Sequence, residues 1–271
     1  MKRFSGLLVF AALALLWEAC SRARLVSPLY FPPISTIAAM FWKLTVSGVL
    51  PTQAGQTLAR ALAGLALAAL VAIPLGLAMG VSRRIAGLLT PTVELLRPVP
   101  PPAIIPAAML FLGIGPAMKL CVIFFACFFP ILIGAVDGAR DVALDFRLTA
   151  AAYGLSRRDT LLGVILPAAG PSVAAGFRTA VPMALIVAVL SEMIGATSGI
   201  GHYILRMQRT FAIPEMYAGV AMLGLMGLLV NAAVALVLGR LLRWHEGWKG
   251  ITRTEDFGRG SAPPEPSSPG R

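Results

Sequence analysis

Strongly apolar, uncharged stretches alternate with short clusters of basic residues along most of the chain. A helix that crosses a hydrocarbon core of about 30 Å needs about 20 predominantly apolar residues. Stretches that meet or approach this length lie at residues 4–20, 61–81, 103–113, 120–136, 179–197 and 216–239. The pattern therefore predicts an all-α fold, that of a polytopic membrane protein with about six transmembrane helices.

Two proline-containing segments depart from this simple pattern. Residues 97–102 read RPVPPP, and each proline lacks a backbone N–H. We therefore expect an irregular loop there, followed by a short helix whose core runs from Ala103 to Leu112. Residues 160–177 are also long and uncharged, but their prolines and glycines would leave backbone groups unpaired in lipid. We expect this segment at the cytoplasmic interface and not as a seventh span.

The composition excludes a soluble globular enzyme. Of the 271 residues, 58% are hydrophobic and only 13% are charged, whereas soluble domains carry about 25% charged residues. A formal net charge of +11 would suggest nucleic acid in a soluble protein. Here the basic residues flank the apolar stretches, where they orient membrane helices, so we predict no nucleic-acid partner. With six spans and both termini cytoplasmic, most Lys and Arg residues fall on the cytoplasmic side.

The two ends of the chain differ from the segments between them. Lys2 and Arg3 precede an apolar stretch, as in a secretory signal, but Trp17 and Glu18 stand where a cleavage site needs small residues. We therefore predict an uncleaved first span. From residue 250 to 271 the apolar content falls and Pro, Ser and Gly dominate. This composition predicts a disordered cytoplasmic tail behind a membrane domain of residues 1–249.

Several kinds of active site have no counterpart in the sequence. It contains no phosphate-binding G-x-x-x-x-G-K-[ST] motif and no H-E-x-x-H zinc motif, and its cysteines lack metal-ligand spacing. We predict no cofactor, no metal and no catalytic residue in this chain. An intramembrane enzyme is a remote alternative, because the paired catalytic groups it needs are not seen. If the chain moves a solute, the energy enters from another chain.

The segment predicted as the longest cytoplasmic loop, residues 137–178, contains the most informative pattern. Three alanines at positions 150 to 152 precede Gly154, the polar turn SRRD follows, and an apolar strip ends at Leu166 and Pro167. Small residues beside a glycine allow a helix to approach a partner closely. The pattern predicts a compact helix–turn–helix knob with basic flanks that include Arg157. An ordinary amphipathic hairpin at the interface is the alternative, and the residues alone leave both open.

Glu192 is the other residue that we single out, because it lies within the fifth apolar stretch in VLSEMIGATSGIG. A charge there costs several kcal/mol unless it is paired or hydrated. Glu192 could line a transport path or form a polar contact between helices, and both readings stay open. A carboxylate would repel an anionic solute, so we do not predict it as a ligand of one.

Residues 148–167 resemble the EAA loop of the membrane subunits of bacterial ABC importers. The family pattern is E-A-A, three residues, Gly, nine residues, Ile, one residue, Leu-Pro. Gly154 fixes the alignment, Leu166 and Pro167 then fall at the required spacing, and Ala150 matches the second alanine. The sequence departs from the pattern at Leu148, Thr149 and Val164, which replace the glutamate, the first alanine and the isoleucine. An acidic contact to the ATPase would therefore be either missing or supplied elsewhere, for example by Asp145 or Asp159.

The resemblance extends over about residues 25–244. Three segments are similar to the nitrate, sulfonate and taurine branch of these permeases: PPISTIAAMFWKLTVSGVLPTQAGQTLARALAG, GLAMGVSRRIAGLLTPTVELLRPVPPPAIIPAAMLFLGIGPAMK and SEMIGATSGIGHYI. The resemblance implies a permease of the bacterial inner membrane that works as a homodimer, with the solute path between the subunits. Its other partners would be two ABC ATPase subunits and an extracytoplasmic substrate-binding protein. The implied solute is a small anion, with a vitamin precursor or another uncharged or cationic compound as the alternative.

The resemblance also implies roles for the loop residues. Ala150 and Gly154 would allow close docking on the ATPase, Arg157 would pair with an acidic rim, and Leu166 with Pro167 would fix the return into the membrane. ATP-driven closure of the ATPase subunits would push on the two loops and tilt the helices, as in rigid-body alternating access.

Overall fold

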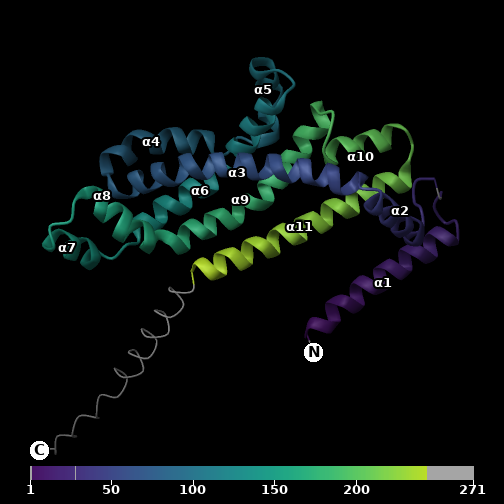
Figure 1. Cartoon of the computed structure of the whole chain (residues 1–271), viewed down its shortest axis with the longest axis horizontal. Helices are drawn as coiled ribbons and strands as arrows, with labels where there is room; N and C mark the ends of the chain where they lie inside the picture. Colours follow the sequence, from purple (N-terminus) through teal and green to yellow (C-terminus); the bar gives the residue numbers. More distant parts are fainter. Residues whose placement is uncertain (1, 28, 243–271) are drawn as a thin grey trace, which may run out of the picture.

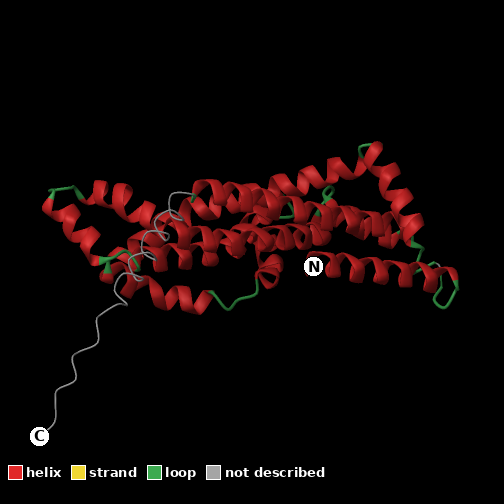
Figure 2. Ribbon diagram, turned by 90° about the horizontal axis from the view of Figure 1, so that it is seen from below, coloured by secondary structure: helices red, strands yellow, loops and turns green. Residues whose placement is uncertain are grey.

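The computed structural model describes residues 2–27 and 29–242, and their side chains except those of residues 2–8, 10, 144 and 147. Over these residues every regular element is a helix, as Figure 2 shows. The all-α fold expected from the apolar pattern is therefore confirmed for the described part of the chain. The predicted disordered tail, residues 250–271, lies outside it.

The helices follow one another through short connections. In chain order they are α1 (Lys2–Arg22), α2 (Ile34–Val46), α3 (Val49–Val81), α4 (Arg83–Leu96), α5 (Ile105–Leu112), α6 (Pro116–Arg140), α7 (Leu144–Ala152), α8 (Arg157–Thr160), α9 (Leu166–Gly195), α10 (Ile200–Arg209) and α11 (Ile213–Leu241). A 3₁₀ turn, η1 (Pro101–Ile104), precedes α5. A π-helical segment, η2 (Leu161–Ile165), joins α8 to α9.

Four helical segments are long and apolar enough to cross a membrane: α3, α6, the continuous run Arg157–Gly195 and α11. The continuous run joins α8, η2 and α9, and we call it the long helix. A fifth crossing is available if α4 and the segment Pro101–Leu112 count as one span that is bent by 87°. α1 covers the first predicted span, residues 4–20, but it is not among the helices that meet this test within the described residues. The count of six spans stays a prediction.

The bundle has two distinct ends (Figure 1). α7 and α8 extend past one end, which we call the hairpin end, and α2 and α10 lie at the opposite end. α11 runs along the outside, and only 11% of its most apolar window is buried. A helix that is apolar on all sides and so little buried is suited to contact with lipid.

The core lies between α3, α6 and α9. Its buried side chains include Ala72 of α3, Ile123 of α6 and Ala188 of α9. Where α9 crosses α6, a β-carbon added at Gly176 would lie 2.5 Å from the carbonyl oxygen of Pro130. The two backbones therefore approach closely, as small residues permit in membrane helix pairs.

The helices extend beyond the charge-free stretches from which the spans were predicted. α3 begins at Val49 and not at 61, so Arg60 lies inside it, and α6 begins at Pro116 and not at 120, so Lys119 lies inside it. Both charged residues are therefore part of a helix, and the buried Glu192 carboxylate pairs with Arg60.

Residues 160–177, which we expect at the cytoplasmic interface, form the first half of the long helix. The long helix has 39 residues and a span needs only about 20, so the interfacial position of this half stays a prediction. Only residues 141–156 connect α6 to the long helix, so the loop is much shorter than the predicted 137–178. Prolines inside membrane helices are tolerated where neighbouring helices help to satisfy the freed backbone groups, and α6 packs against this part of α9.

α4 and α5 form an elbow beside the bundle. α4 runs back along α3 and ends near its middle, and α5 leaves the bundle steeply (Figure 1). The chain bends at RPVPPP because its prolines cannot continue the hydrogen bonds of α4. The short helix predicted at 103–113 corresponds to α5 and the end of η1. Leu110 and Phe111 are 81% and 84% exposed, so the tip of α5 packs little against its own chain.

The close approach of α6 and α9 predicts opposite effects for two glycine substitutions. Gly176→Ala would press a methyl group on the Pro130 carbonyl and lower stability by about 1–3 kcal/mol. Gly224→Ala in α11, where an added β-carbon meets nothing within 4 Å, would raise stability by about 0.5–1 kcal/mol through helix propensity. Thermal unfolding of the purified protein in detergent measures both. Equal effects of the two variants would contradict the packing described here.

Candidate functional site

The predicted knob exists as a helical hairpin made of α7, the turn after it and α8, residues 144–160, here called the hairpin. α7 ends in a reversal at Gly154, whose φ is +68°, a left-handed conformation that favours glycine. The Leu155 N–H donates to the Ala150 carbonyl at 3.1 Å, and the Gly154 N–H donates to the Ala151 carbonyl at 3.0 Å. These two bonds form a Schellman motif, which satisfies the last carbonyl groups of α7.

α8 begins at once because Ser156 caps it. The Asp159 N–H donates to Ser156 Oγ at 3.2 Å, and Ser156 Oγ donates to the Asp159 carboxylate at 2.6 Å. A capping residue with an acidic residue three positions later is a strong helix-start signal. Asp159 therefore serves the cap of α8, while Asp145 lies exposed in the first turn of α7.

The hairpin brings three of the predicted loop residues together. Ala150 is buried inside it with 3% exposure, whereas Gly154 and Arg157 are exposed at its turn. Its outer surface also carries large apolar groups, because Leu148 is 57% and Tyr153 is 82% exposed. An exposed apolar surface at the tip of a protruding hairpin is typical of a protein contact.

Leu166 and Pro167 do not lie in the turn but in the first residues of α9. Leu166 is half-buried against a cluster that includes Leu77, Ala139 and Ile165. Pro167 is exposed. The apolar strip that seemed to end there in the sequence continues as helix α9. Pro167 falls in the first turn of α9, directly after the π-helical η2, where the hydrogen-bond pattern already changes.

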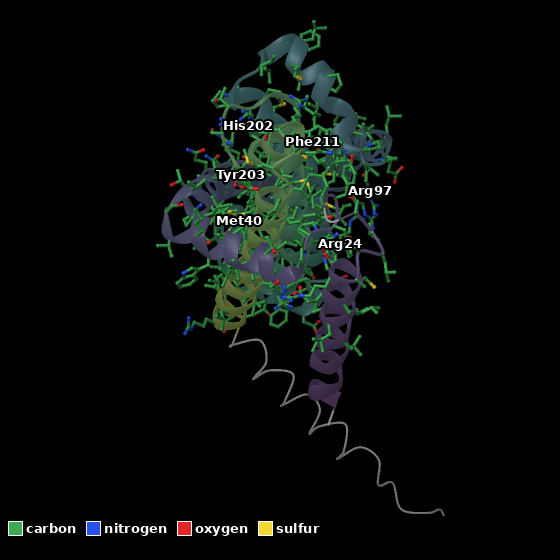
Figure 3. All side chains as sticks on the ribbon, turned by 90° about the vertical axis from the view of Figure 1, so that its right-hand side faces the viewer. Arg24, Met40, Arg97, His202, Tyr203 and Phe211 are labelled. Atoms are coloured by element: carbon green, nitrogen blue, oxygen red, sulfur yellow. The ribbon has the colours of Figure 1, made fainter. Side chains whose placement is uncertain are left out.

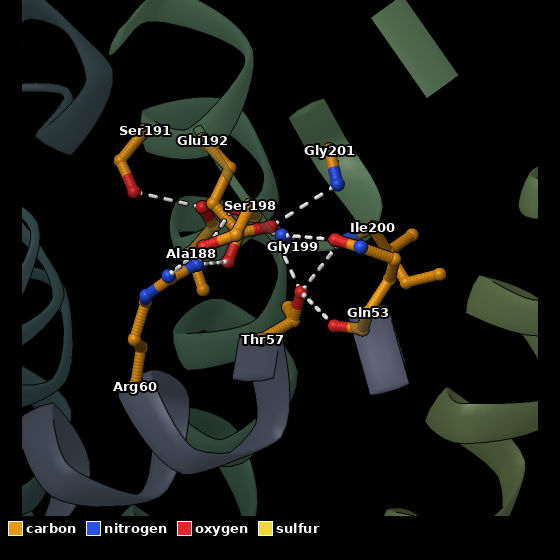
Figure 4. Close-up of polar contacts among 10 residues, drawn as sticks. All are labelled: Gln53, Thr57, Arg60, Ala188, Ser191, Glu192, Ser198, Gly199, Ile200 and Gly201. Carbon is orange, nitrogen blue, oxygen red and sulfur yellow. Dashed lines mark hydrogen bonds and ion pairs between the residues drawn. The ribbon is translucent and has the colours of Figure 1, made fainter. Parts of the chain in front are cut away.

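Glu192 lies at the other end of the long helix and is buried, with 1% exposure (Figure 4). Its carboxylate accepts a hydrogen bond from Arg60 Nη1 at 2.5 Å, from Thr57 Oγ1 at 2.8 Å and from the Gly201 N–H at 3.1 Å. The arrangement gives the carboxylate a charge partner and two neutral donors, which is what a buried acid requires. Of the two roles considered for Glu192, these contacts correspond to a polar contact between helices.

The residues around Glu192, here called the Glu192 cluster, join three parts of the chain. Arg60 of α3 also donates from Nη1 to the Ser198 carbonyl at 2.9 Å and from Nη2 to Ser198 Oγ at 2.7 Å. The Gly199 N–H donates to Gln53 Oε1 at 2.6 Å, and the Ile200 N–H donates to Thr57 Oγ1 at 2.8 Å. The cluster therefore fixes the end of α9 and the start of α10 to α3.

Lys119 of α6 contributes a further positive charge close to this cluster. It is only 6% exposed, and it lies within electrostatic range of both Arg60 and Glu192. Among the described residues, no group of three or more His, Cys, Asp or Glu side chains could hold a metal ion. The cluster is thus an arrangement of charges and amides that holds helices together, with no acid–base pair set up for catalysis.

A cleft of about 660 Å³ lies on the other face of α6 and α9, where the elbow after α4 approaches them. Its lining includes Arg97 from the elbow, Phe125, Phe129 and Asp137 from α6, and Thr179 from α9. Viewed from the end that carries α2 and α10, Arg97 lies on the opposite side of the bundle from Met40 and Tyr203 (Figure 3). Volume and mixed lining are in the range of small-molecule sites.

Comparison with known families identifies the fold. Residues 72–244 match the family described as "Binding-protein-dependent transport system inner membrane component". The chain belongs to this family. It is a transport permease and not an enzyme, and the ATPase of such a system is a separate subunit.

Curated relatives agree along most of the length of this permease. The taurine transport system permease protein TauC of Escherichia coli strain K12 is 32% identical over 242 residues, 87% of each chain. The putative aliphatic sulfonates transport permease protein SsuC of Bacillus subtilis strain 168 is 29% identical over 90% of this chain and 89% of its own. The nitrate import permease protein NrtB of Leptolyngbya laminosa is 30% identical over 76% of this chain and 71% of its own. The predicted family and transport role are confirmed.

Sequence reasoning missed the partners of Glu192 in this permease. The span predicted at 61–81 leaves Arg60 just outside it, yet Arg60 lies a third of the way along α3. A signal was available, since Gln53, Thr57 and Arg60 recur at helical spacing and form one polar stripe in an apolar helix. A polar stripe of that kind indicates a buried polar partner on a neighbouring helix.

The Glu192 cluster predicts that the charge of Glu192 stabilises the permease. Glu192→Gln keeps the shape but leaves Arg60 without a counter-charge, and we expect a loss of about 3 kcal/mol. The apparent melting temperature in detergent measures this loss. The double variant with Arg60→Gln should lose less than the sum of the two single variants, because neither charge is then unpaired.

Glu18→Gln is the matched control. Glu18 also forms an ion pair, with Arg22 at 2.7 Å, but the Arg22 side chain is 68% exposed. Exposed pairs contribute little, so this variant should leave the melting temperature nearly unchanged. A loss at Glu18 equal to that at Glu192 would contradict the role assigned to burial.

Proposed function

We propose that this permease imports a small organic or inorganic anion, such as a sulfonate, taurine or nitrate, as one half of a homodimer in the bacterial inner membrane. The relatives named above carry these solutes in their names and are 29–32% identical over most of the chain. The wide lipid-suited surface of α11 fits a subunit that is surrounded partly by lipid and partly by a second copy.

The observation that carries the proposal is the position of the hairpin. It extends past the bundle between the end of α6 and the start of the long helix, two helices that are in close backbone contact at Gly176. A displacement of the hairpin therefore acts directly on both. We infer that each hairpin binds one ATPase subunit and passes its motion to the membrane helices by rigid-body alternating access.

Each predicted loop residue has a place in this contact. Ala150 packs inside the hairpin and keeps it thin, and Gly154 makes the turn that the ATPase subunit receives. Arg157 is exposed beside the turn, where it would meet an acidic rim. Leu166 and Pro167 form the base of the long helix, where Leu166 packs against the ends of α3 and α6.

The hairpin end faces the cytoplasm in this proposal. Arg83, Arg84, Arg140, Arg157 and Arg158 all belong to helix ends or connections there. Their accumulation at one end follows the positive-inside rule. α11 runs toward the hairpin end, and α1 begins on the side of the hairpin end and runs toward α2 (Figure 1). Both termini would therefore be cytoplasmic.

The cleft on α6 and α9 is this subunit's half of the solute path. It lies between the hairpin end and the level of the elbow, and it is built from the two helices that the hairpin connects. A second copy that faces it across a two-fold axis would close the path. A binding protein on the opposite side of the membrane would deliver the solute.

Reconstitution tests the transport part of the proposal. The permease, its ATPase and its binding protein in proteoliposomes should accumulate labelled taurine, an alkanesulfonate or nitrate only when ATP is supplied. Omission of the binding protein should abolish uptake. Accumulation of an uncharged vitamin precursor, with none of the anions transported, would contradict the proposed solute class.

Substitution at the hairpin turn tests the ATPase contact. An added β-carbon at Gly154 meets nothing within 4 Å, so the ring of Gly154→Trp would project into the proposed contact. We expect co-purification of the ATPase to be lost while membrane insertion is kept. Gly154→Asn is the control, because asparagine tolerates the left-handed backbone and adds little volume. Unchanged co-purification with Gly154→Trp would show that the contact lies elsewhere.

A further inference from the structure

Arg97 occupies an unusual position for a charged residue, at the end of α4 and deep in the membrane domain. α4 has 14 residues, so a rise of 1.5 Å per residue puts Arg97 about 20 Å from the hairpin end. It shares the cleft with Phe125, Phe129 and Thr179, which lie near the middle of α6 and α9. The length of α4, which ends near the middle of α3 (Figure 1), puts Arg97 at the middle level of the spans.

A guanidinium at this depth has no partner within the described part of the chain. No described side chain forms an ion pair or a hydrogen bond with the guanidinium of Arg97, and the residue is exposed toward the cleft. This differs from Arg60, whose guanidinium is occupied by Glu192 and Ser198. A charge within the span region is costly unless it pairs or faces a water-filled path, and it then marks that path as functional.

The rest of the cleft lining suits an anion with a small organic part. Phe125 and Phe129 of α6 supply an apolar wall, and Ser172 and Thr179 of α9 supply hydroxyl groups. The two carboxylates of the lining, Asp137 and Asp141, lie at the last turn of α6 and just after it. The cleft is therefore cationic at the middle of the spans and anionic at the hairpin end.

We propose that Arg97 is the cation that binds the acidic group of the transported solute, a sulfonate or a similar oxyanion, midway through the membrane. The planar guanidinium donates two parallel hydrogen bonds to such a group, and the low dielectric around the cleft strengthens them. Asp137 and Asp141 repel an anion at the cytoplasmic mouth, so within the cleft the anion is bound at Arg97 and not at the mouth. This inference rests on the proposed function and adds to it the residue that selects for negative charge.

Uptake by the reconstituted complex of permease, ATPase and binding protein tests the role of Arg97. Arg97→Gln should lower uptake of labelled taurine or of a linear alkanesulfonate roughly 10- to 100-fold. Arg97→Lys should keep part of it, because the charge stays but the two-pronged geometry is lost. ATPase co-purification and the ATPase rate stimulated by the binding protein should stay within about twofold of wild type in both variants. Arg84→Gln, on the same helix but outside the cleft, should leave uptake unchanged.

Two results would overturn the proposal. One is normal uptake by Arg97→Gln. The other is that Arg97→Gln loses uptake together with assembly or thermal stability, and that adding Asp137→Asn restores them. Arg97 would then balance the charge of a carboxylate, across the cleft or in a second copy. Failure of the wild-type complex to transport any anion would instead count against the proposed function, so the two failures are distinguishable.

Discussion

The ion pair between Glu192 and Arg60 connects α3 to the long helix, two of the three helices that form the core. Glu192 is buried at the end of the long helix, and Arg60 lies inside α3. A buried carboxylate without a partner would be strongly destabilising, so both charges must stay together wherever the helices move. The same contacts hold the start of α10 through Ser198, Gly199 and the backbone beyond them.

This connection attaches the far end of the long helix to α3. The helix runs without interruption from Arg157 in the hairpin to Gly195 beside the Glu192 cluster. With α3 attached at one end and α6 in backbone contact near Gly176, the three helices form one mechanical unit. If an ATPase subunit binds the hairpin as proposed, its motion would reach the opposite end of the bundle through these packed helices, as rigid-body switching requires.

The sequence predicted the fold class and the hairpin turn well, because both depend on local signals. Apolar stretches, Gly154 with its preceding alanines, and the Ser156–Asp159 cap are each readable within a few residues. The helix borders were harder, since we placed them at charges. Arg60 lies inside α3 and pairs with Glu192, and Lys119 lies inside α6. Residues 160–177 lie inside the long helix in spite of their prolines, because α6 covers them, and their interfacial position stays a prediction.

The π-helical turn η2 lies between the hairpin and the rest of the long helix. A π turn holds one more residue than an α turn, and each residue of an α-helix advances the chain by about 100° around the axis. Loss or gain of a single residue within 161–165 would rotate the hairpin by roughly a quarter turn while leaving the membrane-embedded register intact. If the hairpin is the ATPase contact, such a change would re-aim it toward a differently shaped ATPase while the packing of α3, α6 and α9 stays as it is.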